Sequence, residues 1–395
     1  MPPRSIPLEI AHLIINLLPT WHNRHNLHST ALVCSAWLPV ARAIIFRDIH
    51  LTSRNVAKFI ELASADPSFV QRTRELTLHP HMDETLTGPT LLESLPQLSC
   101  LARSPITALT IDDCDDAHGG NIRDQVHRLA KFIAATLPKI TDLSINIMRF
   151  DSIASIQTFA SALPNVSNLH LDIVVMDDLQ EDEDEDTVLH PIFPKLRTFL
   201  GTHTDLEECR WFMDALVTME PWPAVEDVTV FGVNREDISI WSSHKLLEKV
   251  SSSVTSLHLH HQYIHVEDTY EAVSLPPLPL LRKLEVYFSD PRPEISSWDA
   301  IVPIAHIFAS ICSPQIEEIT IGFDNTMKDS EAMIRWANWS DLDRVLSGPQ
   351  FVSLKRLNVS TERDGDDPEF KSNLDLIAEQ MKYCDRENTL RIVHD

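Results

Sequence analysis

Histidines gather in one part of the chain and give the first candidate for chemistry. His258 and His260 alternate with apolar residues, and His261 and His265 follow them. Alternate residues of a strand point to the same side, so the first two imidazoles would share a face. Charged and aromatic residues have the same phase in the next similar segment: Lys283, Glu285 and Tyr287. We predict that these five residues contact a protein substrate; the alternative is a set of solvated polar side chains with no partner.

Other clusters favour plainer explanations. His22, His25 and His28 are spaced by three, but no cysteine or carboxylate completes a zinc site, so we interpret them as solvated loop histidines. The same lack of a ligand cage argues against a metal at His258 and His260. The acidic segment 112–118 lacks the turn residue of a calcium loop. The run Glu181–Asp186 either keeps the protein in solution or attracts a basic substrate.

The motifs of common enzyme classes are missing from the sequence. It contains no GxSxG, no GxGxxG and no GxxxxGK[ST], and only eight of its 395 residues are glycine. Glu317 and Glu318 would point to opposite sides of a strand, so they cannot form an acid–base pair. Cys34 lies in an apolar context, which favours packing over a reactive thiolate. We therefore predict no catalytic residue, no metal and no cofactor.

A short apolar pattern repeats along most of the chain. Its template is apolar-x-x-apolar-x-apolar, as in ITDLSI at 140–145 and VTSLHL at 254–259. Its second apolar position falls at residues 76, 109, 143, 169, 199, 228, 257, 284, 319 and 357. The mean spacing is about 31 residues, which is typical of a solenoid, a propeller or an array.

Prolines and helical patterns lie between these copies. A proline stands two residues before the first apolar position of six copies: Pro138, Pro164, Pro194, Pro223, Pro279 and Pro314. Apolar residues at steps of three and four precede several of them and predict helices over about 122–137, 153–163, 206–219 and 301–311. Proline ends a helix, so each unit reads as a helix, a stop and a strand.

The strands have one polar face, which separates two possible folds. The residue between the last two apolar positions is polar in most copies, for example Ser144, His170 and Glu285. A doubly wound sheet buries both faces, so its strands would be apolar throughout. We therefore predict an α/β solenoid over residues 51–395, a right-handed coil with a parallel sheet on its concave face. Its pattern resembles irregular leucine-rich repeats over about 70–360, which carry LxxLxL on the strand.

The first fifty residues predict three short helices. Ile10, Leu13, Ile14 and Leu17 form an apolar stripe, and further helices are predicted at about 27–33 and 36–46. Such a small unit buries too little surface to fold alone. Its apolar side chains either pack on a first strand of the repeats, expected at 46–51, or form an exposed patch for a partner.

The same segment resembles an F-box of fungal type. The resemblance rests on Pro7, Glu9 and Ile10, on the Leu18-Pro19 end of the first helix, and on Leu32-Val33-Cys34-x-x-Trp37. F-box proteins dock on a Skp-family adaptor of a cullin-based ubiquitin ligase and hold a substrate on a second domain. The resemblance implies an adaptor-binding domain at 1–50 and a substrate-recognition domain at 51–395. The implied adaptor contacts are Pro7, Leu8, Ile10, Ile14, Leu17, Pro19, Leu32, Val33, Cys34 and Trp37.

Composition narrows the possible partners and compartment. With 33 basic and 58 acidic residues, the formal net charge is −25, which disfavours nucleic acid. We expect no membrane span and no signal peptide, and six scattered cysteines favour a reducing, intracellular location, cytoplasmic or nuclear. The main expectation is a substrate receptor of a Skp–cullin–F-box ligase. The alternative is a protein-interaction scaffold with a relic F-box.

Overall fold

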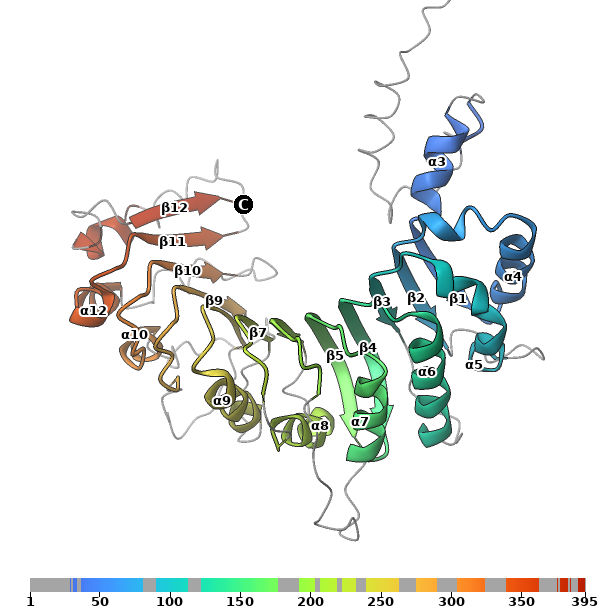
Figure 1. The fold of residues 1–395 in the computed structure, drawn as a ribbon. Helices are drawn as coiled ribbons and strands as arrows, with labels where there is room; N and C mark the ends of the chain where they lie inside the picture. Colours follow the sequence, from blue (N-terminus) through green and yellow to red (C-terminus); the bar gives the residue numbers. More distant parts are fainter. Residues whose placement is uncertain are drawn as a thin grey trace, which may run out of the picture. The chain divides into compact units, whose positions relative to one another are not determined.

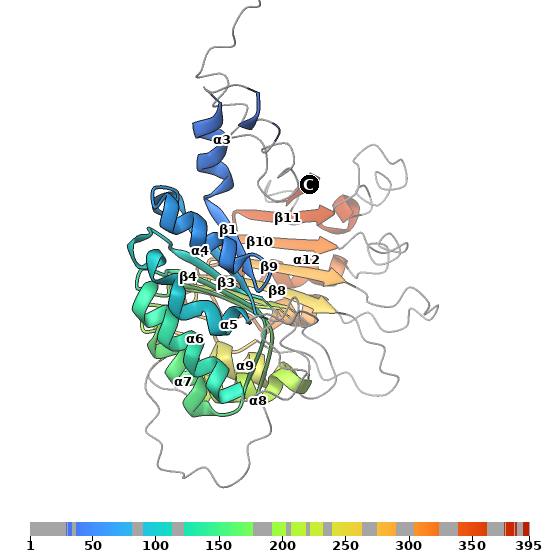
Figure 2. The same cartoon turned by 90° about the vertical axis from the view of Figure 1, so that its right-hand side faces the viewer.

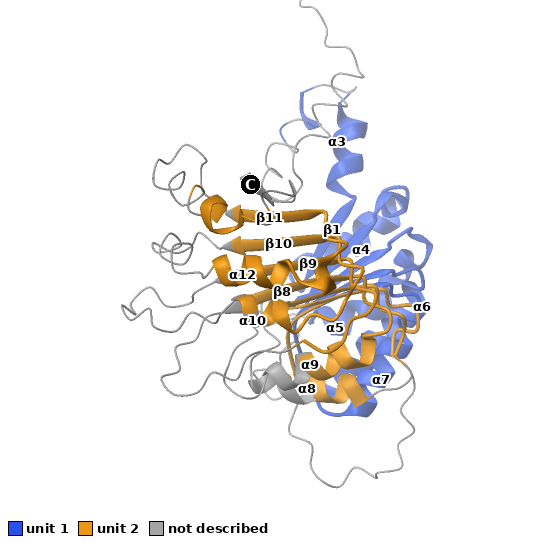
Figure 3. Cartoon of the chain, turned by 90° about the vertical axis from the view of Figure 1, so that its left-hand side faces the viewer, with its two compact units in different colours: residues 1–169 blue, residues 170–395 orange. Residues whose placement is uncertain are grey.

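The structure is a computed structural model, and most of its repeat region is described. The described residues are 29, 31–33, 37–80, 90–112, 122–176, 192–202, 207–218, 222–231, 239–262, 275–289, 304–323, 339–361, 375, 377–382, 384 and 390–394. The chain folds into two compact units, residues 1–169 and 170–395 (Figure 3). Each unit is described by itself below.

Unit 1 alternates helices with parallel strands. Its elements are α3 (Leu38–Ile45), β1 (Asp48–Thr52), α4 (Val56–Ala65), η1 (Val70–Arg72), β2 (Glu75–His79), α5 (Leu91–Ser94), η2 (Leu95–Arg103), β3 (Ala108–Ile111), α6 (Ile122–Thr136), β4 (Asp142–Phe150) and α7 (Ile153–Ser161) (Figure 1). Strand β5 (Asn168–Met176) spans the boundary between the units. Strands β1 to β4 pair in chain order.

Unit 2 continues the same alternation. Its elements are β6 (Thr198–Gly201), α8 (Glu207–Thr218), β7 (Asp227–Phe231), α9 (Ser239–Val250), β8 (Ser256–Gln262), β9 (Lys283–Ser289), α10 (Ile304–Ala309), β10 (Glu318–Phe323), α12 (Trp339–Leu346), η3 (Pro349–Phe351), β11 (Arg356–Thr361) and β12 (Leu390–His394). Strands β6 to β12 also pair in chain order, and every pair is parallel. The prediction of a parallel sheet with intervening helices is confirmed.

The predicted repeat positions stack directly on one another. In unit 1, Leu76, Leu109 and Leu143 are register partners in successive strands. In unit 2 the register row is Phe199, Val228, Leu257, Leu284, Ile319, Leu357 and Leu390. Apart from Leu390, whose side chain is not described, these residues are at most 2% exposed. The apolar template is therefore the row that joins each repeat to the next.

A backbone ladder fixes the start of each strand. The carbonyl of Arg47 accepts hydrogen bonds from the N–H groups of Arg74 and Glu75, at 2.8 and 3.0 Å. Equivalent carbonyls accept two N–H groups each, at Arg74, Thr107 and Thr141 in unit 1 and at Arg197, Glu226, Thr255, Arg282 and Glu317 in unit 2. Because buried backbone groups need hydrogen-bond partners, these paired bonds fix the register at the residue just before each strand begins.

Helices cover one face of the strands in each unit. In unit 1, α6 contacts α7, η2 and β4, and its inward residues Val126, Leu129 and Ile133 are buried (Figures 1 and 2). Ser152 caps α7, since its hydroxyl accepts from the N–H of Ser155. In unit 2, α8 contacts α9 and α10 contacts α12. The sheet face opposite the helices is called the open face below.

The structure adds elements that the sequence analysis did not predict. Helices α4, α5, α9 and α12 and strand β12 lie outside the predicted set, whereas β1 overlaps the strand expected at 46–51. Of the predicted N-terminal helices, part of the third is described as α3, and Ser29 and Ala31 of the second are helical. Two residues separate α3 from β1. The division at residues 50 and 51 remains a prediction.

Candidate functional site

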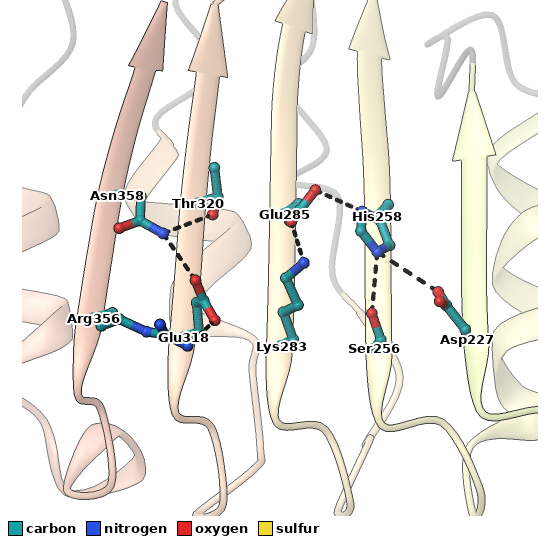
Figure 4. Close-up of polar contacts among 9 residues, drawn as sticks. All are labelled: Asp227, Ser256, His258, Lys283, Glu285, Glu318, Thr320, Arg356 and Asn358. Atoms are coloured by element: carbon teal, nitrogen blue, oxygen red, sulfur yellow. Dashed lines mark hydrogen bonds and ion pairs between the residues drawn. The ribbon is translucent and has the colours of Figure 1, made fainter. Parts of the chain in front are cut away.

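The structure brings the five predicted substrate-contact residues together on the open face of unit 2. His258 and His260 lie on β8, opposite Glu285 and Tyr287 on β9. Nδ1 of His258 lies 2.7 Å from Oε2 of Glu285, and Nζ of Lys283 lies 2.6 Å from Oε1 of the same carboxylate (Figure 4). The rings of His260 and Tyr287 stack with centroids 4.8 Å apart and planes 9° apart.

Glu285 is the electrostatic centre of this group. The hydrogen bond from His258, followed by the interaction with Lys283, lowers the pKa of Glu285 from 4.5 to about 2, although burial opposes the shift. The ionised carboxylate can only accept, so Nδ1 of His258 donates to it. In a neutral ring, Nε2 then accepts from the hydroxyl of Ser256, 3.1 Å away.

Further residues that the sequence analysis missed extend the site. Oδ1 of Asp227 lies 3.6 Å from Nε2 of His258. On the other side of β9, Arg356 forms an ion pair with Glu318 at 2.6 Å, and Asn358 donates to Glu318 at 3.0 Å (Figure 4). These residues lie on the same side of their strands as the predicted ones. The alternation of polar and apolar residues in the sequence could therefore have identified them. We call this set of ten residues the unit 2 patch: Asp227, Ser256, His258, His260, Lys283, Glu285, Tyr287, Glu318, Arg356 and Asn358.

The unit 2 patch has the chemistry of a recognition surface. Two of its three carboxylates are matched by nearby cations, because Lys283 neutralises Glu285 and Arg356 neutralises Glu318. The side chain of Glu285 is 15% exposed and that of His258 is 21% exposed, so both remain accessible from the open face. Fixed charges beside a stacked aromatic pair can select a partner by hydrogen bonding and shape. Ser256, His258 and Glu285 also form a hydroxyl–imidazole–carboxylate chain, with contacts of 3.1 and 2.7 Å, which is the order of contacts between a nucleophile, a base and the group that orients the base.

A second polar group lies on the open face of unit 1, and the sequence analysis missed it. Asp48, His50, His79 and Asp112 form a continuous chain of contacts. Nε2 of His50 lies 3.2 Å from Asp48, Nδ1 of His50 lies 3.4 Å from Nε2 of His79, and Nδ1 of His79 lies 3.0 Å from Asp112. The two imidazole rings stack with centroids 5.6 Å apart. The strand expected at 46–51 is β1, but the polar side chains on its open face were not singled out in the sequence.

The predicted adaptor-binding residues are only partly described. Those outside the described residues are Pro7, Leu8, Ile10, Ile14, Leu17, Pro19 and Cys34. Of the remainder, Leu32 is 86% exposed and Val33 is 61% exposed, while Trp37 is half-buried at the start of α3. Ala41 is the buried residue of α3; Leu38, Val40, Ile44 and Ile45 are half-buried. This segment therefore presents apolar surface.

Several other predicted features cannot be placed. The loop histidines 22, 25 and 28, the run 181–186 and His265 lie outside the described residues, as does the acidic segment after Asp112. The backbone of His261 belongs to β8, but its side chain is not described. Within the described ranges, no three His, Cys, Asp or Glu side chains are grouped so that they could hold a metal ion. No described helix is both long enough and apolar enough to span a bilayer.

Comparison with known proteins gives no further assignment. No protein-family model matches the chain, and no curated protein matches it.

Proposed function

We propose that this protein is the substrate-recognition subunit of a Skp–cullin–F-box ubiquitin ligase. In this proposal the N-terminal helices form an F-box that binds a Skp-family adaptor. The repeats wind as a right-handed coil, the usual hand for parallel strand–helix–strand connections. The open face holds a protein substrate, so substrate lysines meet the ligase at high effective concentration. The protein itself needs no catalytic residue.

The observation that carries the proposal is the exposure of Leu32 and Val33. Large apolar side chains exposed by 86% and 61% side by side are typical of a surface that a partner covers. These two residues belong to the Leu32-Val33-Cys34-x-x-Trp37 string on which the F-box resemblance rests. Burying each of them at an interface would contribute about 1.5–3 kcal/mol before the costs of association.

The connection between α3 and the repeats supports a fixed geometry. Only Phe46 and Arg47 separate α3 from β1, and the ring of Phe46 packs on Phe69 with centroids 4.8 Å apart. The carbonyl of Arg47 is already part of the backbone ladder of unit 1. An adaptor bound next to α3 would therefore be held at a defined position relative to the open face of unit 1.

The test compares two exposed apolar sites in the full-length protein. The double variant Leu32→Asp/Val33→Asp removes the proposed docking surface, and Val352→Asp is the matched control because Val352 is 80% exposed in unit 2. Binding to a purified Skp-family adaptor is measured by calorimetry, together with substrate ubiquitylation in the reconstituted ligase. We expect the double variant to weaken adaptor binding by more than about tenfold and the control by less than about twofold.

Failure of the wild-type protein to bind the adaptor would reject the ligase. Equal effects of the double variant and the control would reject Leu32 and Val33 as the docking surface. If a partner protein is bound through the unit 2 patch while no adaptor is bound, the chain is instead a scaffold with a relic F-box.

A further inference from the structure

The strand register arranges the open face of unit 1 in three rows. The row at the strand starts is Asp48, Glu75, Ala108 and Asp142, and the middle row is His50, Thr77, Thr110 and Ser144. The third row contains Thr52 and His79, with Asp112 beside His79. These described positions hold four carboxylates and neither lysine nor arginine. These rows are therefore anionic, and the basic residue of β1 to β4 on the same side is Arg149, which lies further along β4 between the buried Met148 and Phe150.

Local hydrogen bonds orient two of these carboxylates without neutralising them. Asp142 accepts from the hydroxyl of Thr141 at 2.6 Å and from the amide of Asn168 at 2.5 Å. Asp112 is 33% exposed and lies beside the imidazole of His79. Glu75 differs, since Arg47 lies 3.5 Å from it at the edge of the sheet. Asp112 and Asp142 thus offer negative charge in fixed directions.

The open face of unit 2 provides an internal comparison. There Lys283 pairs with Glu285 on the same strand, and Arg356 on β11 pairs with Glu318 on the neighbouring strand β10. A cationic ligand would have to displace those side chains. On unit 1 it would meet carboxylates held by a hydroxyl, an amide and an imidazole, so the two faces favour different partners.

The shape of the unit 1 face suits an extended chain. The middle row has small hydroxyl side chains, at Thr77, Thr110 and Ser144, between the two carboxylate-bearing rows. Neighbouring strands lie about 4.8 Å apart, and rows two residues apart along a strand are separated by about 6.7 Å. The row ends at the stacked rings of His50 and His79. A planar guanidinium can stack on aromatic rings while it binds a carboxylate.

We propose that the open face of unit 1 binds an extended polypeptide segment rich in lysine and arginine. Its cations pair with Asp48, Asp112 and Asp142, its backbone crosses the hydroxyl row, and the net charge of −25 draws it toward the surface. In the ligase proposed above, this segment would belong to the substrate. Binding itself requires no adaptor, so the two proposals can fail separately.

The test uses the full-length chain and a fluorescent peptide of about 12 residues in which lysine and arginine alternate with serine. Anisotropy is measured at low salt and at about 0.15 M salt, with a glutamate–serine peptide as the acidic analogue. The face variant is Asp48→Asn/Asp112→Asn/Asp142→Asn. The matched control, Glu61→Gln/Asp124→Asn/Glu379→Gln, removes the same charge from exposed residues on helices.

We expect the wild type to bind only the basic peptide, with binding weakened by salt. The face variant should lose affinity by more than about tenfold and the control by less than about twofold. Equal losses in the two variants would overturn the proposal, because they would report overall charge alone. No binding by the wild type at low salt, or equally tight binding of spermine, would also overturn it.

A measurement on the wild type guards against misfolding of the variants. The same basic peptide with a photoreactive benzophenone is crosslinked to the unmodified protein, and the attachment sites are mapped by mass spectrometry. Crosslinks within β1 to β4 support the proposal. Crosslinks confined to other parts of the chain overturn it.

Discussion

The ring of Tyr287 occupies the space that a side chain at position 322 would need. A Cβ atom added to Gly322 would overlap Cδ1 and Cε1 of this ring. The two residues are register partners on β9 and β10, and His260 stacks on the ring from β8. The glycine therefore lets the phenol ring lie over the next strand, where it is held between His260 and the backbone of β10.

Gly322→Ala should destabilise the protein despite replacing glycine in a strand. Alanine is ordinarily favoured over glycine there by about 0.5–1 kcal/mol. The overlap with Tyr287 should outweigh this gain and lower the free energy of unfolding by about 1–3 kcal/mol. Urea unfolding of the full-length protein measures the change. A variant as stable as the wild type would show that the ring moves aside at little cost.

The double variant Tyr287→Ala/Gly322→Ala separates the overlap from other effects. Without the ring, alanine at 322 has room, so its penalty should disappear. The double-mutant cycle should give a coupling of about 1–3 kcal/mol between the two positions. Additive effects would contradict the direct contact.

Replacing Glu285 with glutamine should change the pH dependence of stability. The pKa of Glu285 falls from 4.5 to about 2 on folding, so its contribution is present above pH 4.5 and is lost as the pH falls toward 2. Allowing for solvent screening, we expect Glu285→Gln to lower the free energy of unfolding by about 1–2 kcal/mol at neutral pH. Urea unfolding of both proteins should show this difference shrinking as the pH falls below about 4. A difference that is constant with pH would mean that the glutamine disturbs packing rather than charge.

The sequence predicted the strands well because each one has to supply the same buried row. Leu109, Leu143, Leu257 and Leu284 have the template spacing, and all four are register residues in the sheet. Helix α9 was missed because the copy that follows it, at Val254, has no proline to mark its end. Strand β12 was missed because Glu387 stands where the template has its first apolar residue.

The sequence predicted which residues of the candidate site share a face of the sheet, because this follows from the alternation of residues along a strand. His258, Lys283 and Glu285 meet because register partners on adjacent parallel strands share a face. The choice of partners depends on side-chain conformations, which periodicity does not specify. Thus Lys283 pairs with Glu285 on its own strand, whereas Arg356 reaches Glu318 on the neighbouring strand.

Phe69→Ala should loosen the junction between α3 and the repeats. The ring of Phe69 is 3% exposed and contacts both Phe46, which follows α3, and Phe59 of α4. Removing a buried phenylalanine typically costs about 3–5 kcal/mol of stability. Hydrogen exchange followed by mass spectrometry should show faster exchange in α3 and β1.

Phe159→Ala is the matched control for this prediction. Phe159 is 1% exposed and packs edge-on against Phe150, far along the sequence from α3. It should cost a similar amount of stability, but the faster exchange should be centred on α7 and β4. The same exchange pattern in both variants would mean that unit 1 opens as a whole and that Phe69 has no special role at the junction.

The cysteines should differ widely in their reactivity toward iodoacetamide. Burial, with a smaller contribution from Asp343, raises the pKa of the Cys384 thiol to about 12, so about one molecule in ten thousand carries the thiolate at pH 8. Cys312 is an exposed free cysteine. Mass spectrometry of the folded protein should therefore find Cys312 alkylated before Cys384, and Cys384 alkylated only after denaturant is added. Equal rates without denaturant would show that the segment around Cys384 opens readily, in conflict with its 2% exposure.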